Sequence, residues 1–404
     1  MRFEQDFVRD GRFLPEGISL DTVLRQHETP LYLYSGAVIR EKYRLLSSAF
    51  PDFRVHYSLK ANPNPEICRL LFSLGAGAEV SSAAELETAL KAGAAPDRIV
   101  FVGPAKTSSD IRAAVEAGIA GLVVDSAEEL AAVDAVGQEL GKPVTALLRI
   151  NTIEQPRAWE TMVGGPSKFG FDEETVVRDV ASVRLSTVRI AGIHVYSASQ
   201  VLDPTFLVSH IEYVLHLAGR LVRRIGFELS YIDFGGGFGV PYQEDEPELD
   251  LGPVGQAAAR MVKEHQSLLS GIRLIFESGR FLVAEAGLFI TRVVRVKRSR
   301  GRVFAITDGG MNAFSRPVVM RVPHPVRLLN RLTDPATTDV DICGPICTPV
   351  DCLAKGVRLP EPVVGDVVGF LNAGAYGYTM SLHQFMSRPR PAQLLADAGE
   401  LRVI

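Results

Sequence analysis

The segment Arg54-Val55-His56-Tyr57-Ser58-Leu59-Lys60-Ala61-Asn62 places a lysine directly after a short β-type run. In a barrel of parallel strands, the residue at the carboxyl end of a strand faces the mouth in which active sites form. A lysine at one strand end is common and needs no chemical explanation. This lysine gains weight because later strand-like runs of the chain also end in residues with chemistry.

Strand-like runs alternate with helical patterns from about residue 54 to residue 282. The expected strands are 54–59, 77–80, 98–102, 120–124, 144–150, 189–195, 229–234 and 272–276. The expected helices include 82–92, 108–118, 126–140, 204–225 and 253–269. Eight strands alternating with helices favour a (β/α)8 TIM barrel. A doubly wound sheet is the weaker alternative, because no G-x-G-x-x-G sequence follows the first strand.

Two long segments interrupt this alternation. Residues 151–168 include the single tryptophan, Trp159, and we expect them to form either a lid over the barrel mouth or a surface loop. Residues 239–252 contain the acidic run Gln243-Glu244-Asp245-Glu246, for which we expect a solvated loop.

The pattern changes after residue 283. Short β-type runs with turns between them replace the helical periods, namely Leu288–Val296, Val303–Ile306, Val340–Ile342 and Val367–Phe370. We therefore expect a barrel domain over residues 36–282 and a C-terminal all-β domain over residues 283–404. Residues 1–35 contain the run Leu31-Tyr32-Leu33-Tyr34 and are expected to join the second domain.

The composition is that of an ordinary globular protein, with 404 residues of which 47% are hydrophobic and 22% charged. The net charge of −4 favours neither nucleic acid nor an anionic membrane as a partner. The segment Met1–Asp6 is charged and lacks the apolar core of a signal peptide, and no apolar run is long enough to span a bilayer. These features predict a cytoplasmic protein.

Three of the four cysteines, Cys343, Cys347 and Cys352, lie close together in the sequence. Their spacing is not that of a usual zinc site and no histidine follows closely, so we expect no metal. One reactive thiol among structural neighbours is the favoured interpretation.

The later strand ends carry groups suited to a phosphate. Gly235, Gly236 and Gly237 let the backbone approach an anion closely and direct several N–H groups at it. Ser197 and Arg280 follow neighbouring strands and would add a hydroxyl group and a charge-assisted hydrogen bond. A glycine triplet alone is more often a tight turn, so the prediction depends on the combination.

Other strand ends carry groups suited to an aldehyde cofactor. Lys60 would supply the amine that condenses with the aldehyde. Glu277 would pair with a pyridine nitrogen and keep it protonated, so that the ring draws electrons from the substrate. His194 would lie near the cofactor ring, although a hydrogen-bonded core histidine is the more common case. Together these residues describe a site for pyridoxal 5'-phosphate (PLP).

The motifs resemble, in order and over almost the whole chain, those of fold type III PLP-dependent decarboxylases, the family of diaminopimelate and ornithine decarboxylases. Tyr57–Asn62 is similar to the PLP-lysine segment, and Gly192–Ser197 to the segment with a ring-stacking histidine and a phosphate-binding serine. Asp233–Phe238 is similar to the phosphate loop, and Glu277-Ser278-Gly279-Arg280 to the glutamate motif. The resemblance implies an alanine racemase-like fold with PLP as cofactor.

The second domain carries further motifs of the same family. Arg316 resembles the arginine that holds a substrate carboxylate, and Tyr376 the tyrosine that reaches the cofactor phosphate. Cys347 resembles the thiol that protonates the substrate carbon after carbon dioxide has left. Asp351 stands where the family has an aspartate near the substrate. Because the family takes this cysteine and aspartate from a partner subunit, the resemblance implies a homodimer with active sites at the interface.

Two positions depart from the diaminopimelate decarboxylases. Thr348 replaces a glutamate that reads the far end of the substrate, and Met320 replaces a tyrosine. Leaving a zwitterionic far end unpaired costs about 1–3 kcal/mol. The sequence Cys-Thr-Pro-x-Asp instead resembles a branch that acts on amino acids joined to a larger group. Examples are an acyl-carrier-protein thioester in butirosin biosynthesis and a citryl conjugate in siderophore assembly.

We therefore expect α-decarboxylation of a carrier-bound or conjugated L-amino acid in antibiotic or siderophore metabolism. A cationic run between residues 292 and 302 would either dock an acidic carrier protein or form the solvated face of a strand. One alternative is meso-diaminopimelate decarboxylation in lysine biosynthesis. Another is a non-catalytic PLP-binding or regulatory homologue, against which the retained Lys60 and Cys347 argue. Alanine racemases pair the pyridine with arginine, so Glu277 argues against racemisation.

Overall fold

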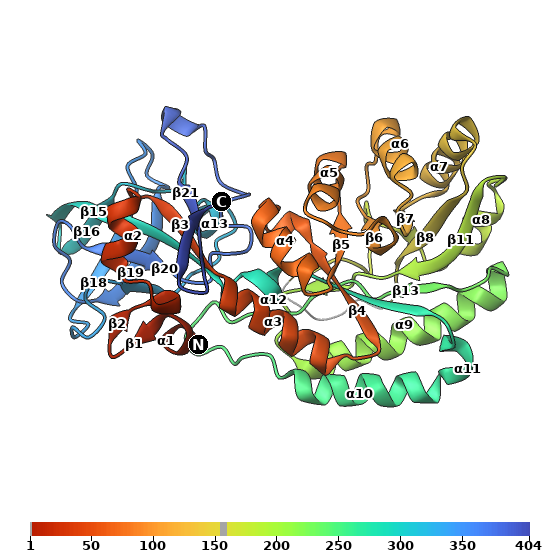
Figure 1. Ribbon diagram of the computed structural model, residues 1–404, viewed down its shortest axis with the longest axis horizontal. Coiled ribbons are helices and arrows are strands. Elements are labelled where there is room, and N and C mark those ends of the chain that lie inside the picture. The colour runs from red at the N-terminus through yellow and green to blue at the C-terminus, as the bar shows by residue number, and fades with distance from the viewer. Residues whose placement is uncertain (1, 154–159) are drawn as a thin grey trace. The chain divides into compact units, whose positions relative to one another are not determined.

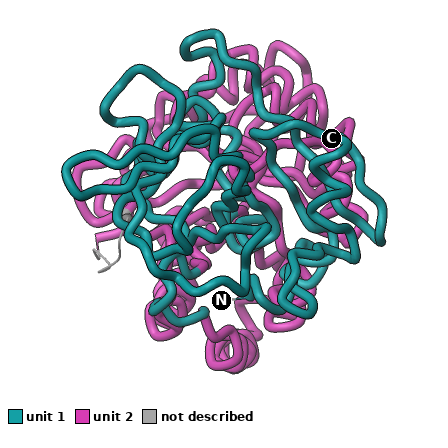
Figure 2. Tube along the Cα trace, turned by 90° about the vertical axis from the view of Figure 1, so that its left-hand side faces the viewer, with its two compact units in different colours: residues 1–42, 241–248, 280–404 teal, residues 43–240, 249–279 magenta. Residues whose placement is uncertain are grey.

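The computed structural model describes residues 2–153 and 160–404, and the chain divides into two compact units. The first comprises residues 43–240 and 249–279, and the second comprises residues 1–42, 241–248 and 280–404 (Figure 2). The two units are described separately below.

In the described part of the first unit, eight parallel strands form a closed barrel, as the sequence predicts (Figure 1). They are β4 (Phe53–Ser58), β5 (Gly77–Val80), β6 (Ile99–Phe101), β7 (Gly121–Val124), β8 (Val144–Asn151), β11 (Val188–His194), β13 (Tyr231–Asp233) and β14 (Arg273–Ser278). Each strand pairs with the next one along the chain, β14 pairs with β4, and the ring is therefore complete.

Helices alternate with these strands in the sequence. They are α4 (Pro65–Ser73), α5 (Ala83–Lys91), α6 (Ser108–Ala117), α7 (Ala127–Leu140), α8 (Val176–Ala181), α9 (Pro204–Ile225), α10 (Leu251–Glu264) and α11 (Gln266–Leu269). The sequence encodes several of their ends. Thr107 and Asp110 form a reciprocal capping box at the start of α6, and Gly118 ends that helix in the left-handed conformation.

The barrel strands are apolar on both faces. β5, β6 and β7 are buried along their whole length, as expected for parallel strands with one face toward the helices and the other toward the interior. One buried cluster joins side chains from several strands, namely Val100, Val102, Ala120, Val123, Leu147, Ala191, Tyr231 and Ile275. This packing holds the strands in register, and with them the residues at their carboxyl ends.

The second unit is built on a mixed sheet. Its strands are β3 (Leu31–Ser35), β15 (Gly287–Ser299), β16 (Arg302–Thr307), β17 (Val326–Leu328), β18 (Thr338–Cys343), β19 (Cys352–Leu359), β20 (Val367–Phe370), β21 (Ala392–Asp397) and β22 (Glu400–Val403). β3, from the N-terminal residues, pairs with β15 and β21. The short strands β1 (Val8–Arg9) and β2 (Arg12–Phe13) form a separate pair.

The second unit is β-rich, as expected, and it also contains short helices that the sequence did not reveal. These are α1 (Phe3–Phe7), α2 (Leu20–Gln26), α12 (Arg280–Val283) and α13 (Arg316–Val319), while α3 (Gly36–Ala49) continues into the barrel unit. Their brevity explains the difference, since helices of four to seven residues carry no visible 3.6-residue period.

The two interrupting segments are only partly loops. Residues 160–161 form β9 (Glu160–Thr161), which pairs with β12 (Ala198–Ser199), whereas Trp159 lies outside the described residues. The lid therefore stays a prediction. In the second segment Glu244 and Asp245 are exposed, in agreement with a solvated loop. Within the described ranges, none of the helices combines the length and apolar character needed to cross a bilayer.

Candidate active site

Lys60 lies just beyond β4, in a 3₁₀ helix of one turn, Leu59–Ala61. Its Nζ is 2.8 Å from Oε2 of Glu79, and its side chain is 41% exposed. Glu79 is fully buried in β5, and Ser81 Oγ donates a hydrogen bond to its other oxygen at 3.0 Å. The Lys60 amine is therefore held at the carboxyl end of the barrel but remains accessible.

Glu277 is buried in β14, and its Oε1 lies 3.4 Å from Nε2 of His194 in β11. Although close, these atoms do not form a hydrogen bond, and Oε1 has no hydrogen-bond partner among the described residues. Burial alone would raise the pKa of Glu277, but His194, Lys60 and Arg149 outweigh it and lower this pKa to about 2. Glu277 is therefore an anion in a buried, largely cationic setting.

Asp233, at the end of β13, lies beside this carboxylate. It is fully buried, and its Oδ1 accepts a hydrogen bond from the Gly235 N–H at 2.9 Å. Burial and the neighbouring charge of Glu277 raise the pKa of Asp233 well above its ordinary value. Of the two neighbouring carboxyl groups, Glu277 therefore carries the negative charge and Asp233 the proton.

The aromatic ring that lies over the Lys60 amine is Tyr196, at 5.9 Å from Nζ to the ring centroid. His194, which the sequence proposes as the stacking residue, instead contacts Glu277 and has both ring nitrogens buried. Ring stacking by His194 stays a prediction.

The glycine triplet packs tightly against its own barrel. Gly235 and Gly237 have φ values of +61° and +109°, which residues with a Cβ atom rarely adopt. A Cβ atom on Gly236 would lie 2.3 Å from the carbonyl oxygen of Glu277. The local structure therefore requires glycine here whether or not a phosphate binds, and phosphate binding stays a prediction.

Ser197 is joined to the same loop through His210 of α9. His210 Nε2 donates to the Phe234 carbonyl at 2.8 Å, so its Nδ1 accepts the hydrogen bond from Ser197 Oγ at 3.0 Å. Burial lowers the pKa of His210, which agrees with this neutral form. Ser197 would have to turn its hydroxyl hydrogen away from His210 to donate it to a phosphate.

Gly279 closes the last strand end of the barrel. A Cβ atom there would lie 2.7 Å from Cβ of Ala61 and 3.1 Å from the Ser58 carbonyl. A glycine thus lets the segment after β14 approach the turn that carries Lys60.

In the β-rich unit, Arg280 lies beside two tyrosines. Its guanidinium is 5.0 Å from the ring centroid of Tyr376 and 5.8 Å from that of Tyr242. It also donates a hydrogen bond to Tyr242 Oη at 3.3 Å. A cation and two phenol hydroxyl groups are brought together here, a combination suited to an anionic group.

Arg316 is buried and held by His324. Its Nη1 donates to His324 Nε2 at 2.9 Å, while His324 Nδ1 donates to the Leu371 carbonyl at 2.8 Å. The guanidinium also stacks 4.4 Å from the ring centroid of Tyr242. Burial, together with the charge of Arg316, lowers the pKa of His324 to about 3, so the histidine stays neutral and keeps its acceptor.

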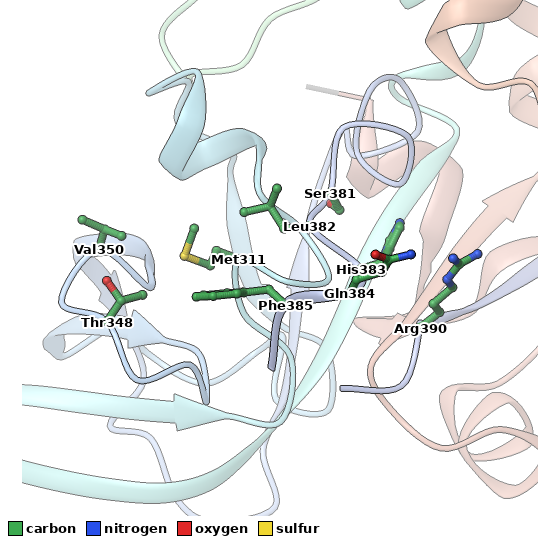
Figure 3. A pocket seen from close by; sticks show the side chains of 9 residues that line it. All are labelled: Met311, Thr348, Val350, Ser381, Leu382, His383, Gln384, Phe385 and Arg390. Carbon is green, nitrogen blue, oxygen red and sulfur yellow. The ribbon is translucent and has the colours of Figure 1, made fainter. Parts of the chain in front are cut away.

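Cys347 is exposed on the loop between β18 and β19, and its backbone N–H donates to Met386 Sδ at 3.4 Å. Thr348 follows it and lines a pocket of about 770 Å³ in this unit (Figure 3). Thr348 and Val350 lie at one end of the pocket and Arg390 at the other, with the Phe385 ring between them. The loop thus presents a thiol next to a largely apolar cavity.

Asp351 organises this loop through hydrogen bonds to the backbone. Its two oxygens accept hydrogen bonds from the backbone N–H groups of Met311 and Ile346, at 2.6 and 2.7 Å. A Cβ atom on Gly310 or Gly344 would lie within 2.6 Å of its carboxylate. Asp351 therefore positions this loop, and its expected role in substrate binding stays a prediction.

The cationic run is partly neutralised. Arg298 forms an ion pair with Glu361, and Arg302 forms one with Asp341. These pairs favour the interpretation of a solvated strand face over a docking site.

The comparison with known families agrees with this geometry. Residues 36–284 match the family model described as pyridoxal-dependent decarboxylase, pyridoxal binding domain. The chain belongs to the pyridoxal-dependent decarboxylases.

Relatives and solved structures agree over almost the full length of this decarboxylase. It is 36% identical to the diaminopimelate decarboxylase of Aquifex aeolicus, over 98% of this chain and 93% of that protein. It is 35% identical to the L-glutamyl-[BtrI acyl-carrier protein] decarboxylase of Niallia circulans, over 95% and 92%. The diaminopimelate decarboxylase structure from Helicobacter pylori complexed with L-lysine matches with a TM-score of 0.87 and 31% identity, covering 95% of each chain.

The decarboxylase uses PLP as its cofactor, and its buried groups fit that molecule. Glu277 presents an ionised, buried oxygen without a hydrogen-bond donor among the described residues, which suits a protonated pyridine nitrogen. Lys60 presents an accessible amine for the aldehyde carbon. When bound, PLP draws electrons from the bond that breaks at the substrate α-carbon.

The chain's own groups have separate tasks around such a cofactor. Glu79 orients the Lys60 amine, and Glu277 would hold a proton on the ring nitrogen of bound PLP. Asp233 and His194 flank Glu277 and keep it in place. Within the β-rich unit, His324 holds the Arg316 guanidinium through a hydrogen bond.

Sequence reasoning missed Glu79, Tyr196, His324 and Tyr242 as parts of the site. The sequence did contain a signal for Glu79. It lies at the end of the second expected strand, just as Lys60 lies at the end of the first. Tyr196 belongs to the motif Gly192–Ser197, in which His194 and Ser197 were chosen instead. His324 lies in a segment without regular secondary structure. Their contacts are visible only after folding.

Proposed function

We propose that this decarboxylase removes the α-carboxyl group of an L-amino-acid moiety that is joined to a larger group. An acyl-carrier-protein thioester is the favoured form, and a citryl-type conjugate is the other member of the class. The supporting observation is the pocket beside Thr348. Among its described lining residues Arg390 is the one permanently charged side chain, and none carries a carboxylate.

The far end of diaminopimelate carries both an ammonium and a carboxylate group. The pocket offers Arg390 to a carboxylate, but its described lining has no acidic partner for an ammonium. Leaving such a group unpaired on binding costs about 1–3 kcal/mol. Met311, Val350, Leu382 and Phe385 give the pocket an apolar wall, which suits an acyl chain or linker.

The similarity to the L-glutamyl-[BtrI acyl-carrier protein] decarboxylase supports the same proposal. The second candidate is meso-diaminopimelate decarboxylation, which the 36% identity to the Aquifex aeolicus enzyme favours. Thr348 distinguishes the candidates, because it replaces an acidic residue expected to read a free amino acid's far end.

Catalysis in this proposal uses Lys60, Cys347 and a homodimer. Lys60 binds the aldehyde cofactor, Arg316 holds a carboxylate, and Cys347 returns a proton to the α-carbon. The exposed position of Cys347 suits a thiol that completes the site of a second subunit. Light scattering of the purified protein tests the dimer, and cell fractionation tests the expected cytoplasmic location.

The decisive experiment measures carbon dioxide release from a panel of matched substrates. The panel contains free L-glutamate, L-lysine and meso-diaminopimelate, the same amino acids as thioesters of an acyl carrier protein, and a citryl-linked amino acid. We expect turnover of one joined substrate to exceed that of its free amino acid at least tenfold. Equal turnover of free and joined forms would refute the proposal.

A matched pair of variants tests the role of the pocket. Thr348→Glu supplies the missing acidic group, and Thr348→Gln has the same size without the charge. We expect only Thr348→Glu to raise turnover of meso-diaminopimelate relative to a joined substrate. Identical effects of the two substitutions would remove the electrostatic argument.

A further inference from the structure

Cys343 and Cys352 face each other across the antiparallel ladder of β18 and β19. The register pairs the two residues directly, next to a bulge, and both are half-buried. Directly opposed antiparallel residues have Cα atoms roughly 4.5–5.5 Å apart, within the range of roughly 4.4–6.8 Å that a disulfide requires. The backbone therefore places the two cysteines at a Cα separation that a disulfide can span.

The two thiols also interact with each other. Their proximity raises the pKa of Cys343 and lowers the pKa of Cys352, whose Sγ also donates a hydrogen bond to the Ala354 carbonyl at 3.3 Å. Burial and Asp341 act against the Cys352 thiolate, whereas Lys355 and Arg302 favour it. Because the thiolate is the nucleophile, Cys352 is the more reactive member of the pair.

The pair closes the base of the loop that carries the exposed thiol. Cys343 ends β18 and Cys352 begins β19, so the loop 344–351 lies between them. Cys347, Thr348 and the positioning carboxylate of Asp351 all belong to this loop. A bond between Cys343 and Cys352 would therefore restrict the segment that bears the proposed proton donor.

We propose that Cys343 and Cys352 form a reversible redox couple whose disulfide closes the base of the loop 344–351. A peroxide is the oxidant. The Cys352 thiolate attacks one peroxide oxygen, the O–O bond breaks, and the released hydroxide takes a proton and leaves as water. Cys352 becomes a sulfenic acid.

The Cys343 sulfur then attacks the Cys352 sulfur. The S–O bond breaks, and the departing hydroxide takes the Cys343 proton and leaves as a second water molecule. Together the two thiols lose two electrons and two protons, which reduce one peroxide to two waters. A dithiol reverses the reaction by thiol–disulfide exchange.

Two observations favour a redox couple over a metal site or a set of inert thiols. Among the described residues, the group with metal-like spacing is His194, Asp233 and Glu277, and it contains no cysteine. Cys68 is fully buried in the barrel unit, and burial raises its pKa to about 12, so it is the inert thiol of the chain. Disulfides in reducing compartments are usually transient and redox-sensing, in agreement with a switch.

The test uses the PLP-loaded protein treated with hydrogen peroxide and then alkylated. Before alkylation we expect a mass decrease of about 2 Da, for the two hydrogen atoms lost, and after it two fewer alkylated cysteines than in the untreated protein. Peptide mapping should join Cys343 to Cys352, and dithiothreitol should restore both thiols. Cys352→Ser and, as a second variant, Cys343→Ala should abolish the link, whereas Cys68→Ser should leave it unchanged.

Hydrogen–deuterium exchange reports the effect on the loop without any substrate. We expect amides of residues 344–351 to exchange about threefold more slowly in the oxidised protein, with no such change in Cys352→Ser. A disulfide through Cys347, oxidation to sulfinic acid without a cross-link, or unchanged exchange in the cross-linked protein would each overturn the proposal.

Discussion

Glu277→Gln is the substitution that tests the buried carboxylate most directly. It keeps the size and shape of the side chain but removes the charge and replaces one acceptor oxygen with an NH2 donor. His194, Lys60 and Arg149 outweigh burial and lower the pKa of Glu277 from 4.5 to about 2. A difference of 2.5 pKa units corresponds to about 3 kcal/mol of preference for an anion at this position.

When PLP is bound, an ionised Glu277 would hold a proton on its ring nitrogen. We expect Glu277→Gln to retain PLP, because Lys60 is unchanged, but to lower the decarboxylation rate about 10²-fold. The rate is measured as carbon dioxide release at saturating cofactor, and the bound cofactor as its visible absorbance.

The pH dependence has a defined sign. Because folding lowers the pKa of Glu277, the stabilisation of its anion is fully present above pH 4.5. It is lost as the pH falls toward about 2. Urea unfolding of the cofactor-free protein should therefore distinguish wild type from Glu277→Gln at pH 7 and less so at lower pH.

The matched control is Glu173→Gln, which neutralises a buried carboxylate paired with Arg220. We expect its decarboxylation rate to stay within about twofold of wild type. A Glu277→Gln enzyme with the wild-type rate, or a control with an equal loss of rate, would refute the reasoning.

The further predictions concern three other residues of the site. Lys60→Ala should abolish the visible absorbance of PLP joined to the protein, and a band that persists would assign the cofactor to another amine. His324→Phe should raise the KM for substrate about tenfold and change kcat less, because Arg316 loses the acceptor that orients it; His324→Gln, which keeps an acceptor, should restore part of the affinity. Folding lowers the pKa of His324 from 6.5 to about 3, so its protonation in the unfolded chain should lower the stability of wild type as the pH falls from 6.5 to about 3. Fluorescence-monitored unfolding should show no such contribution in His324→Gln. Asp351→Ala should lower the free energy of unfolding of the β-rich unit by about 2–4 kcal/mol, because it leaves the N–H groups of Met311 and Ile346 without acceptors; an unchanged urea midpoint would contradict its positioning role.

The barrel was predictable because its signal is local. Each strand is a short apolar run, and the helices between strands are long enough to show their period. The short helices of the β-rich unit lack that period and were missed. The pairing of β3 with β15 joins residues about 250 positions apart, and no local pattern reports it.

The site was predictable only as far as its motifs extend. Lys60, Glu277 and Arg280 belong to compact motifs at strand ends, and the structure confirms that the barrel brings the strand ends together. Asp351 was assigned to the substrate from its motif, and only the structure shows that its oxygens also accept hydrogen bonds from the N–H groups of Met311 and Ile346. A motif indicates which residues matter, but their contacts depend on the surrounding chain.

Residue order alone thus specified a lysine at the end of the first barrel strand, the eight-strand alternation and the PLP chemistry. These depend on periodicity and on residue types that few other reactions need. Tertiary structure decided which groups meet: Glu79 with Lys60, His194 with Glu277, and Cys343 with Cys352. The physical reason is that hydrogen bonds, burial and pKa values arise between side chains distant in sequence, and only folding brings those side chains within a few ångströms of each other.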